Sequence, residues 1–250
     1  MNSAARRILL ALVMAACACA RAGEVTVAVA ANFTAPMQKL AAEFERDTGH
    51  KALLAFGSTG RFHAQVKNGA PFQVLLAADD ETPRKLEAEG FAVPGTRFTY
   101  AVGRLVLWSA APGVVDEGGA VLQKPGDSKI AIADPRLAPY GAAAVQALRR
   151  LGVEAALRPR LVQGESIAQA FQFVATGNAA MGFVALSQAI ADGRIATGSG
   201  WLVPATLHEP IRQDAVLLAR GKDQPAAIAL LAFLRSEKAR ALIRAHGYET

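Results

Sequence analysis

A short, hydroxyl-rich turn, Phe56-Gly57-Ser58-Thr59-Gly60, stands between an apolar run, Ala52 to Phe56, and a run of helical character, Arg61 to Lys67. A turn in this position leaves backbone N–H groups and two hydroxyls at the start of a helix, where the dipole and the unpaired donors favour an anion. The chemistry that such a turn can perform is the binding of an oxyanion. Taken alone, the pattern is more typical of a plain N-cap, in which Ser or Thr satisfies the first turn.

Three other polar turns stand in the same position, after a strand-like run and before a helix-like run. They are Ala31–Pro36, Asp134–Gly141 and Gly164–Ser166. Ligands of parallel α/β sheets bind beyond the carboxyl ends of the strands, where such turns lie. These turns are therefore candidates for the other donors of an anion site.

Alternating strand-like and helix-like runs indicate parallel α/β sheets with helices on both faces. After Gly90 two strand-like runs follow each other, and we expect the chain to cross to a second domain near Val102–Arg104. The strand-like run Asp214–Ala219 and two helices, Pro225–Leu234 and Glu237–Ala245, can return to the first domain. Two crossings make a hinge, so a cleft can close around a ligand.

The N-terminus has the features of a signal peptide. Arg6-Arg7 is followed by the apolar run Ile8–Ala16 and by Ala20-Arg21-Ala22, a small-x-small cleavage site. The apolar run is shorter than the roughly 20 residues that a permanent membrane helix needs. We predict that residues 1–22 are removed and that the mature protein is periplasmic. The alternative is a lipoprotein in which Cys17 carries the lipid.

Composition excludes several classes of function. Both cysteines, Cys17 and Cys19, lie in the leader, so the mature chain can form no disulfide and no thiolate metal site. The formal charge of +6 includes three arginines of the leader, which leaves +6 − 3 = +3 for the mature chain. This charge is too small, and its basic residues too scattered, to indicate nucleic-acid binding. The four histidines have no spacing typical of a metal cation site.

The familiar catalytic motifs of hydrolases, metalloproteases and nucleotide-dependent enzymes are absent from the sequence. The acidic cluster Asp79-Asp80-Glu81 could supply acid–base or metal chemistry, but it precedes Pro83 and is more typical of a helix start. The residues by themselves therefore indicate an exported two-lobed binder of an anion, with an exported enzyme on the same scaffold as the alternative.

Six short motifs, in the same order, resemble those of the periplasmic molybdate-binding proteins of ABC importers. The likeness runs from Glu24 to Tyr248. The motifs are Thr26–Phe33, Phe56–Gly60, Asn68–Phe72, Ala77–Asp79, Ala133–Pro135 and Pro139–Gly141. The resemblance implies an α/β fold of the type II periplasmic binding proteins, with two lobes that are each a mainly parallel sheet flanked by helices. With it we assign residues 23–102 and 216–250 to lobe I and residues 103–215 to lobe II.

The resemblance also implies the ligand and its contacts. Molybdate or tungstate would be held between the lobes by hydrogen bonds alone, without a cofactor, and passed to the permease of an ABC transporter by a monomeric receptor. Side-chain donors would come from Asn32 and from Thr59, with Ser58 beside it. Backbone N–H donors would come from Tyr140 and Ile167.

Two departures from the family pattern concern the site. Many relatives have a hydroxyl residue at the position of Asn32, and many have a ligand-contacting tyrosine at the position of Ala185. The amide of Asn32 can still donate, whereas Ala185 offers only its backbone, so we expect the Tyr140 side chain to replace that contact or the contact to be absent. A receptor for another tetrahedral oxyanion, such as sulfate or phosphate, differs from this hypothesis only in its ligand.

Overall fold

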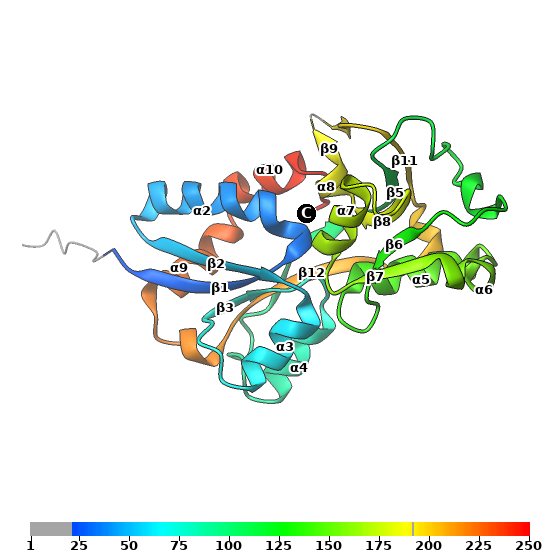
Figure 1. The fold of residues 1–250 in the computed structure, drawn as a ribbon. Helices are drawn as coiled ribbons and strands as arrows, with labels where there is room; N and C mark the ends of the chain where they lie inside the picture. The colour runs from blue at the N-terminus through cyan, green and yellow to red at the C-terminus, as the bar shows by residue number, and fades with distance from the viewer. Residues whose placement is uncertain (1–21, 192) are drawn as a thin grey trace, which may run out of the picture.

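The computed structural model describes residues 22–191 and 193–250. The predicted signal peptide, residues 1–22, and the alternative lipidation site at Cys17 therefore lie outside the described residues, apart from Ala22. In the described part of the chain, no helix is long and apolar enough to cross a membrane. These residues fold into two α/β units, each built around its own five-stranded sheet (Figure 1).

The first sheet has the strand order β2-β1-β3-β12-β4. Its strands are β1 (Glu24–Ala30), β2 (Lys51–Gly57), β3 (Val74–Leu76), β4 (Phe98–Gly103) and β12 (Ile211–Leu217). Strand β1 is parallel to β2 and β3, whereas β12 is antiparallel to β3 and β4. Val25, Val27 and Val29 belong to one hydrophobic core and Ala28 to another, so β1 is buried on both faces. This burial explains its continuous apolar run.

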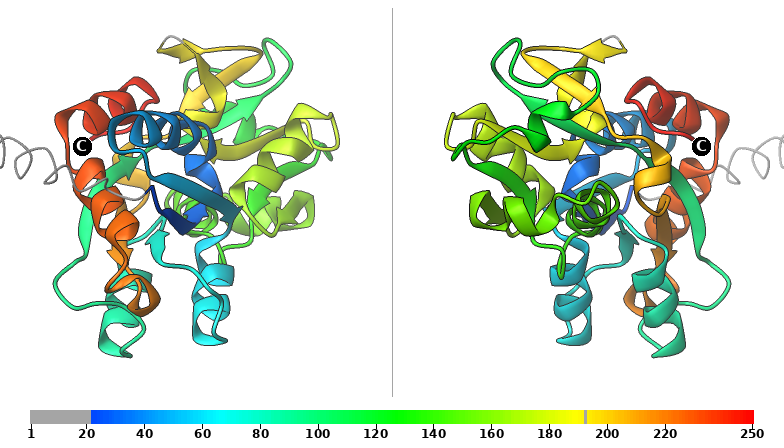
Figure 2. Two further views of the ribbon diagram at one scale, coloured as in Figure 1. Left: turned by 90° about the vertical axis from the view of Figure 1, so that its left-hand side faces the viewer. Right: turned by 90° about the vertical axis from the view of Figure 1, so that its right-hand side faces the viewer.

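Helices cover both faces of the first sheet. They are α2 (Thr34–Thr48), α3 (Thr59–Lys67), α4 (Glu81–Ala88), α9 (Pro225–Leu234) and α10 (Glu237–Ala245), with the short 3-10 helices η1 (Ala31–Phe33) and η5 (Ala219–Gly221). Met37, Leu230 and Ile243 pack in the core that contains the three valines of β1. Phe62 and Leu86 pack in the core on the other face. In Figure 2, α3 and α4 project below the sheet, away from α2 and α10.

The second sheet has the order β11-β5-β8-β6-β7. Strand β6 is parallel to β7 and β8, and β5 is antiparallel to β8 and β11. One hydrophobic core, which includes Leu107, Ile132, Ala147 and Phe183, joins this sheet to its helices. The strands are β5 (Leu105–Ser109), β6 (Ile130–Ala133), β7 (Leu161–Gly164), β8 (Met181–Ala185) and β11 (Ser199–Leu202), with a small hairpin of β9 (Ile190–Ala191) and β10 (Arg194–Ile195). The helices are α5 (Pro139–Arg150), α6 (Glu154–Leu157), α7 (Ile167–Ala175) and α8 (Leu186–Ala189), with η2 (Ala120–Gln123), η3 (Arg158–Arg160) and η4 (Ala205–Leu207). The predicted fold class, two mainly parallel sheets flanked by helices, is confirmed.

The chain crosses between the two sheets twice. Strand β4 ends at Gly103 and β5 begins at Leu105, which puts the first crossing at Arg104. The return lies between the end of β11 and Ile211, because β12 pairs within the first sheet over its whole length. The predicted end of lobe II at residue 215 falls within β12 and divides this strand. The polar residues 212–214 interrupt the apolar pattern, so the sequence marks only the second half of β12.

The two units touch beyond the carboxyl ends of their strands. The Gly60 N–H of the first unit donates to the Leu137 carbonyl of the second at 2.9 Å. A Cβ at position 60 would lie 3.0 Å from the Leu137 Cα, so the close approach favours glycine. Arg61 and Glu165 form an exposed ion pair across the same junction. These contacts describe a closed arrangement of the two units.

Candidate anion-binding site

A small cavity lies where the two units meet. Its wall is formed by η1 and by the starts of α3, α5 and α7. The structure brings together all five residues predicted for the site, and the described residues that line the cavity include no charged side chain. The lining residues are Ala30, Ala31, Asn32, Gly57, Ser58, Thr59, Ala78, Ala138, Pro139, Tyr140 and Ile167.

Ser58 occupies the N-cap position of α3, where a serine hydroxyl ordinarily accepts a hydrogen bond from the first turn. The hydroxyl makes no such bond. Although the side chain is only 4% exposed, no described residue is a hydrogen-bond partner of Ser58 Oγ. A buried polar group without a partner costs about 1–3 kcal/mol. Capping therefore does not account for this side chain, whereas a ligand in the cavity would.

Thr59 begins α3 and is also buried. Its Oγ1 accepts a hydrogen bond from the Ala78 N–H at 2.9 Å, which fixes the position of the hydroxyl. A hydroxyl has one proton to donate in addition to the lone pairs that accept. The Thr59 proton thus remains available for an acceptor in the cavity.

Three helices begin at the cavity wall, and the first N–H groups of a helix have no acceptor within it. The N–H groups of Thr59, Tyr140 and Ile167 are of this kind, and no described residue accepts a hydrogen bond from them. Helices α3, α5 and α7 have 9, 12 and 9 residues, so each adds the positive end of a helix dipole here. The cavity therefore presents neutral donors in a field that favours an anion.

The Tyr140 side chain is buried. Its hydroxyl accepts a hydrogen bond from Gln213 Nε2 at 3.0 Å, and burial raises its pKa well above the ordinary value. The Ala185 N–H donates to Gln188 Oε1 at 3.0 Å, and Ala185 is not among the lining residues. Ala185 thus makes no contact at the cavity in this arrangement, and the Tyr140 hydroxyl is held by Gln213.

Asn32 lies in η1 and is 2% exposed. Its Nδ2 group, the donor predicted for the ion, donates instead to Gln213 Oε1 at 2.8 Å and to the Tyr248 hydroxyl at 3.0 Å. The other polar atom of the amide, Oδ1, has no hydrogen-bond partner among the described residues. The predicted donor, Nδ2, is therefore already bonded within the protein, and the acceptor Oδ1 is the atom without a partner.

Three polar residues behind the cavity, Tyr100, Gln213 and Tyr248, were not among the residues predicted for the site. All three are buried. The Tyr248 hydroxyl donates to the Asn32 carbonyl at 2.8 Å, and burial raises the pKa of Tyr248 to about 12. The Tyr100 hydroxyl donates to Gln213 Oε1 or to the Ala77 carbonyl, each at 3.0 Å. The sequence carries no signal for Gln213, because it lies just before the predicted strand Asp214–Ala219.

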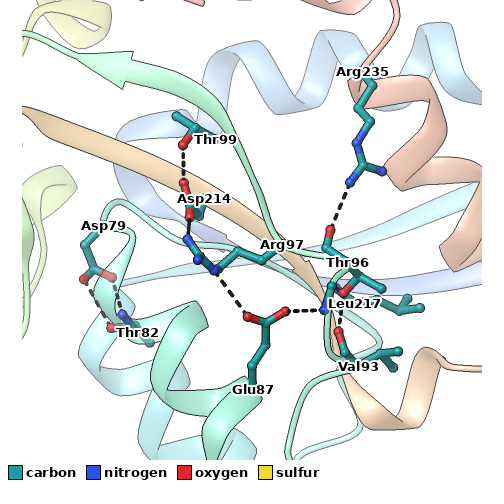
Figure 3. A network of polar contacts seen from close by, with 11 residues as sticks. Asp79, Thr82, Glu87, Val93, Thr96, Arg97, Thr99, Asp214, Leu217 and Arg235 are labelled. Carbon is teal, nitrogen blue, oxygen red and sulfur yellow. Dashed lines mark hydrogen bonds and ion pairs between the residues drawn. The ribbon is translucent and has the colours of Figure 1, made fainter.

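The acidic cluster Asp79-Asp80-Glu81 lies along a larger groove between the units, outside the small cavity. The Asp79 carboxylate accepts hydrogen bonds from the N–H of Thr82 at 2.8 Å and from its hydroxyl at 3.2 Å, in the first turn of α4 (Figure 3). Burial raises the pKa of Asp79, while these two bonds lower it. Asp79 thus satisfies a helix start, the role that the sequence analysis favoured. Among the described residues, no group of three His, Cys, Asp or Glu side chains could hold a metal ion.

Comparison with known proteins finds relatives along the whole chain. The chain is 60% identical over 249 residues to the molybdate-binding protein ModA of Azotobacter vinelandii, with 99% of each chain covered. It is 54% identical to the ModA protein of Rhodobacter capsulatus, over 96% of this chain and 94% of that one. The solved structure of an Azotobacter vinelandii periplasmic molybdate-binding protein superimposes with a TM-score of 0.88, at 43% identity over 90% of this chain and 99% of that chain.

The family model of the bacterial extracellular solute-binding proteins matches residues 25–249. Its members bind solutes and are not enzymes, which confirms the prediction that the chain is not an enzyme. The match to an extracellular family and a periplasmic relative also confirms the predicted location outside the cytoplasm. The resemblance carried by the six motifs is thereby confirmed, and the chain belongs to the family of bacterial extracellular solute-binding proteins.

Proposed function

We propose that this protein is the extracytoplasmic receptor that captures molybdate, and tungstate of the same shape and charge, and delivers it to the permease of an ABC transporter. The observation that carries the proposal is Ser58 Oγ, which is buried and unpartnered in a cavity where three helices begin. The relatives named for molybdate binding, at 60% and 54% identity, supply the ligand.

The proposed contacts come from both units. The hydroxyls of Ser58 and Thr59 and the Thr59 N–H donate from the first unit, and the N–H groups of Tyr140 and Ile167 donate from the second. We also assign Asn32 to the site, with its amide turned so that Nδ2 faces the ion. A closed cavity is required for this set, because neither unit alone carries all the donors.

Neutral donors suit this ligand for a physical reason. Hydrogen bonds to a charged group contribute roughly 1.5–3 kcal/mol each, so several of them, with three helix dipoles, offset the desolvation of a dianion. An arginine would attract every dianion alike. Donors held at fixed positions around a small cavity select by the radius of the anion, and molybdate is larger than sulfate or phosphate.

Calorimetric titration of the mature protein with molybdate, tungstate, sulfate and phosphate tests the proposal. We expect molybdate and tungstate to bind tightly and to raise the melting temperature, because a ligand at 100 times its Kd stabilises by about 2.7 kcal/mol. We expect little effect of sulfate or phosphate. Equal affinity for sulfate would contradict the molybdate assignment, and no binding of any of the four anions would contradict an oxyanion receptor.

A further inference from the structure

A buried hydrogen-bond network behind the cavity connects the two units. Gln213, which is fully buried, stands at its centre. Its Oε1 accepts from Asn32 Nδ2 at 2.8 Å and from the Tyr100 hydroxyl at 3.0 Å, and its Nε2 donates to the hydroxyl of Tyr140, in the second unit, at 3.0 Å. Gln213 thus contacts Asn32 and Tyr140, two of the residues that line the cavity.

The backbone fixes where Gln213 lies. The pairing of β12 with β4 shifts register between Gln213 and Asp214, an irregularity of the kind that redirects side chains. The Asp214 carboxylate is held by Arg97 at 2.6 Å and by Thr99 at 2.7 Å (Figure 3). On β4, a Cβ at Gly103 would lie 2.0 Å from the Tyr140 hydroxyl and 2.5 Å from Gln213 Nε2, so this position requires glycine. The planar amide of Gln213 can turn about its last torsion.

The observed arrangement leaves one group unsatisfied, and it is the wrong group for an anion site. Asn32 lines the cavity, its Nδ2 donors are used by Gln213 and Tyr248, and its Oδ1 has no partner among the described residues. Oδ1 accepts hydrogen bonds and cannot donate. A dianion in the cavity, itself an acceptor, would gain nothing from that atom.

Turning the amides of Asn32 and Gln213 by 180° removes this conflict. Each turn exchanges the positions of the amide nitrogen and oxygen, which is the freedom of a terminal amide torsion. Gln213 Nε2 would then donate to Asn32 Oδ1, while Gln213 Oε1 would accept from the Tyr140 hydroxyl. Tyr100 would keep its bond to the Ala77 carbonyl. In this second arrangement Asn32 Oδ1 has a partner, and the group without one is Nδ2, which can donate to an anion in the cavity.

We propose that Gln213 is a positioning residue that turns together with Asn32, so that binding of the anion selects the arrangement in which Asn32 Nδ2 faces the ion. The inference rests on the proposed function. Gln213 acts through Asn32 and does not touch the ligand. Tyr140 belongs to the second unit, so the turn also changes a hydrogen bond between the units. At present Gln213 Nε2 donates to the Tyr140 hydroxyl, and after the turn the Tyr140 hydroxyl donates to Gln213 Oε1.

Nuclear Overhauser contacts of the Gln213 side-chain amide protons test the turn in the unaltered protein. Without ligand, we expect these protons to contact the Tyr140 ring, whose hydroxyl lies 3.0 Å from Nε2. With molybdate bound, we expect the contacts to move to the ring of Tyr100, which lies beside the present Oε1. If calorimetry shows that the sample is saturated with molybdate and the contacts stay at Tyr140, this inference is wrong but the proposed function still stands. A sample that binds no molybdate would overturn the proposed function and this inference with it.

Two substitutions give a second test. Gln213→Glu supplies only acceptors when ionised, so it holds Asn32 Nδ2 away from the ion, and we expect the Kd for molybdate to rise about 100-fold. Gln213→Met has a similar length and leaves the Asn32 amide free to turn, and we expect a rise of about tenfold or less. Circular dichroism of both variants checks that they fold.

The introduced carboxylate also repels the ion directly, and the same two substitutions in the Asn32→Ala background measure that repulsion. We expect the difference between the Glu and Met variants to become smaller when Asn32 is absent, because the part transmitted through its amide is lost and only the direct repulsion remains. An equal difference in both backgrounds would show that Gln213 does not act through Asn32.

Discussion

Three helices of nine residues, α3, α7 and α10, have a serine at the N-cap, and the serine of α3 behaves differently from that of α10. Ser236 Oγ accepts a hydrogen bond from the Ala239 N–H at 3.2 Å, as a capping serine should. Ser58 has a similar extended backbone, yet its hydroxyl makes no cap. Instead, the Leu137 carbonyl of the second unit accepts the N–H of Gly60 in the first turn. A contact between the units has replaced the side-chain cap, and the serine hydroxyl is left for the cavity.

The largest expected effect comes from placing a carboxylate at each serine. Ser58→Asp puts a negative charge in the cavity, and one pair of like charges 4 Å apart costs about 4 kcal/mol near a protein surface, so we expect the Kd for molybdate to rise by more than about 1,000-fold. Ser236→Asp is the matched control, because aspartate is a good N-cap and should leave the Kd unchanged. Calorimetry measures both. A Ser58→Asp protein that binds within tenfold of the unaltered protein would mean that the ion lies elsewhere.

A smaller effect is expected at the neighbouring hydroxyl. Thr59→Ala removes a donor to the ion, and we expect the affinity for molybdate to fall about 10- to 100-fold. It also takes away the acceptor of the Ala78 N–H, so we expect the free energy of unfolding to fall by about 1–3 kcal/mol with the fold intact. Thr59→Ser keeps the hydroxyl and should bind within about threefold of the unaltered protein. Unchanged affinity of the alanine variant would show that Thr59 acts only through its backbone.

The smallest effects test the comparison most sharply, because each alanine substitution should change a different quantity. Ser58→Ala should change the affinity for molybdate, and Ser236→Ala should change the stability. Ser58→Ala removes an unpartnered buried hydroxyl, so we expect weaker molybdate binding, by about tenfold, without a loss of stability in the ion-free protein. Ser236→Ala removes a working cap, so we expect about 1 kcal/mol less stability and an unchanged Kd. Calorimetry and denaturant unfolding together decide the matter. If both variants lose stability and both keep their affinity, the two serines are caps of the same kind.

Local patterns predicted much of the fold. The two C-terminal helices were predicted at residues 225–234 and 237–245, and α9 and α10 have these bounds, because Pro225 and Ser236 are clear helix starts. The five candidate residues meet at one cavity because each follows a strand whose carboxyl end faces the junction. The assignment of each as a ligand contact remains a prediction.

The rest depended on contacts between distant parts of the chain. Gln213 is 181 residues from Asn32, and Tyr248 is 216 residues from it. A register shift inside β12 and the return of the C-terminus bring these side chains together, and neither leaves a periodic signal in the sequence. For the same reason the sequence did not show that the amide of Asn32 is held by the protein's own acceptors.

The bond between Gly60 and Leu137 also bears on how quickly an ion could leave. Separation of the two units must break this bond, and the start of α3 then loses the acceptor that stands in for its cap. Release is thus coupled to exposure of a helix end. The bond stabilises the closed arrangement, so it contributes to both the affinity and the residence time of the ion without contacting it.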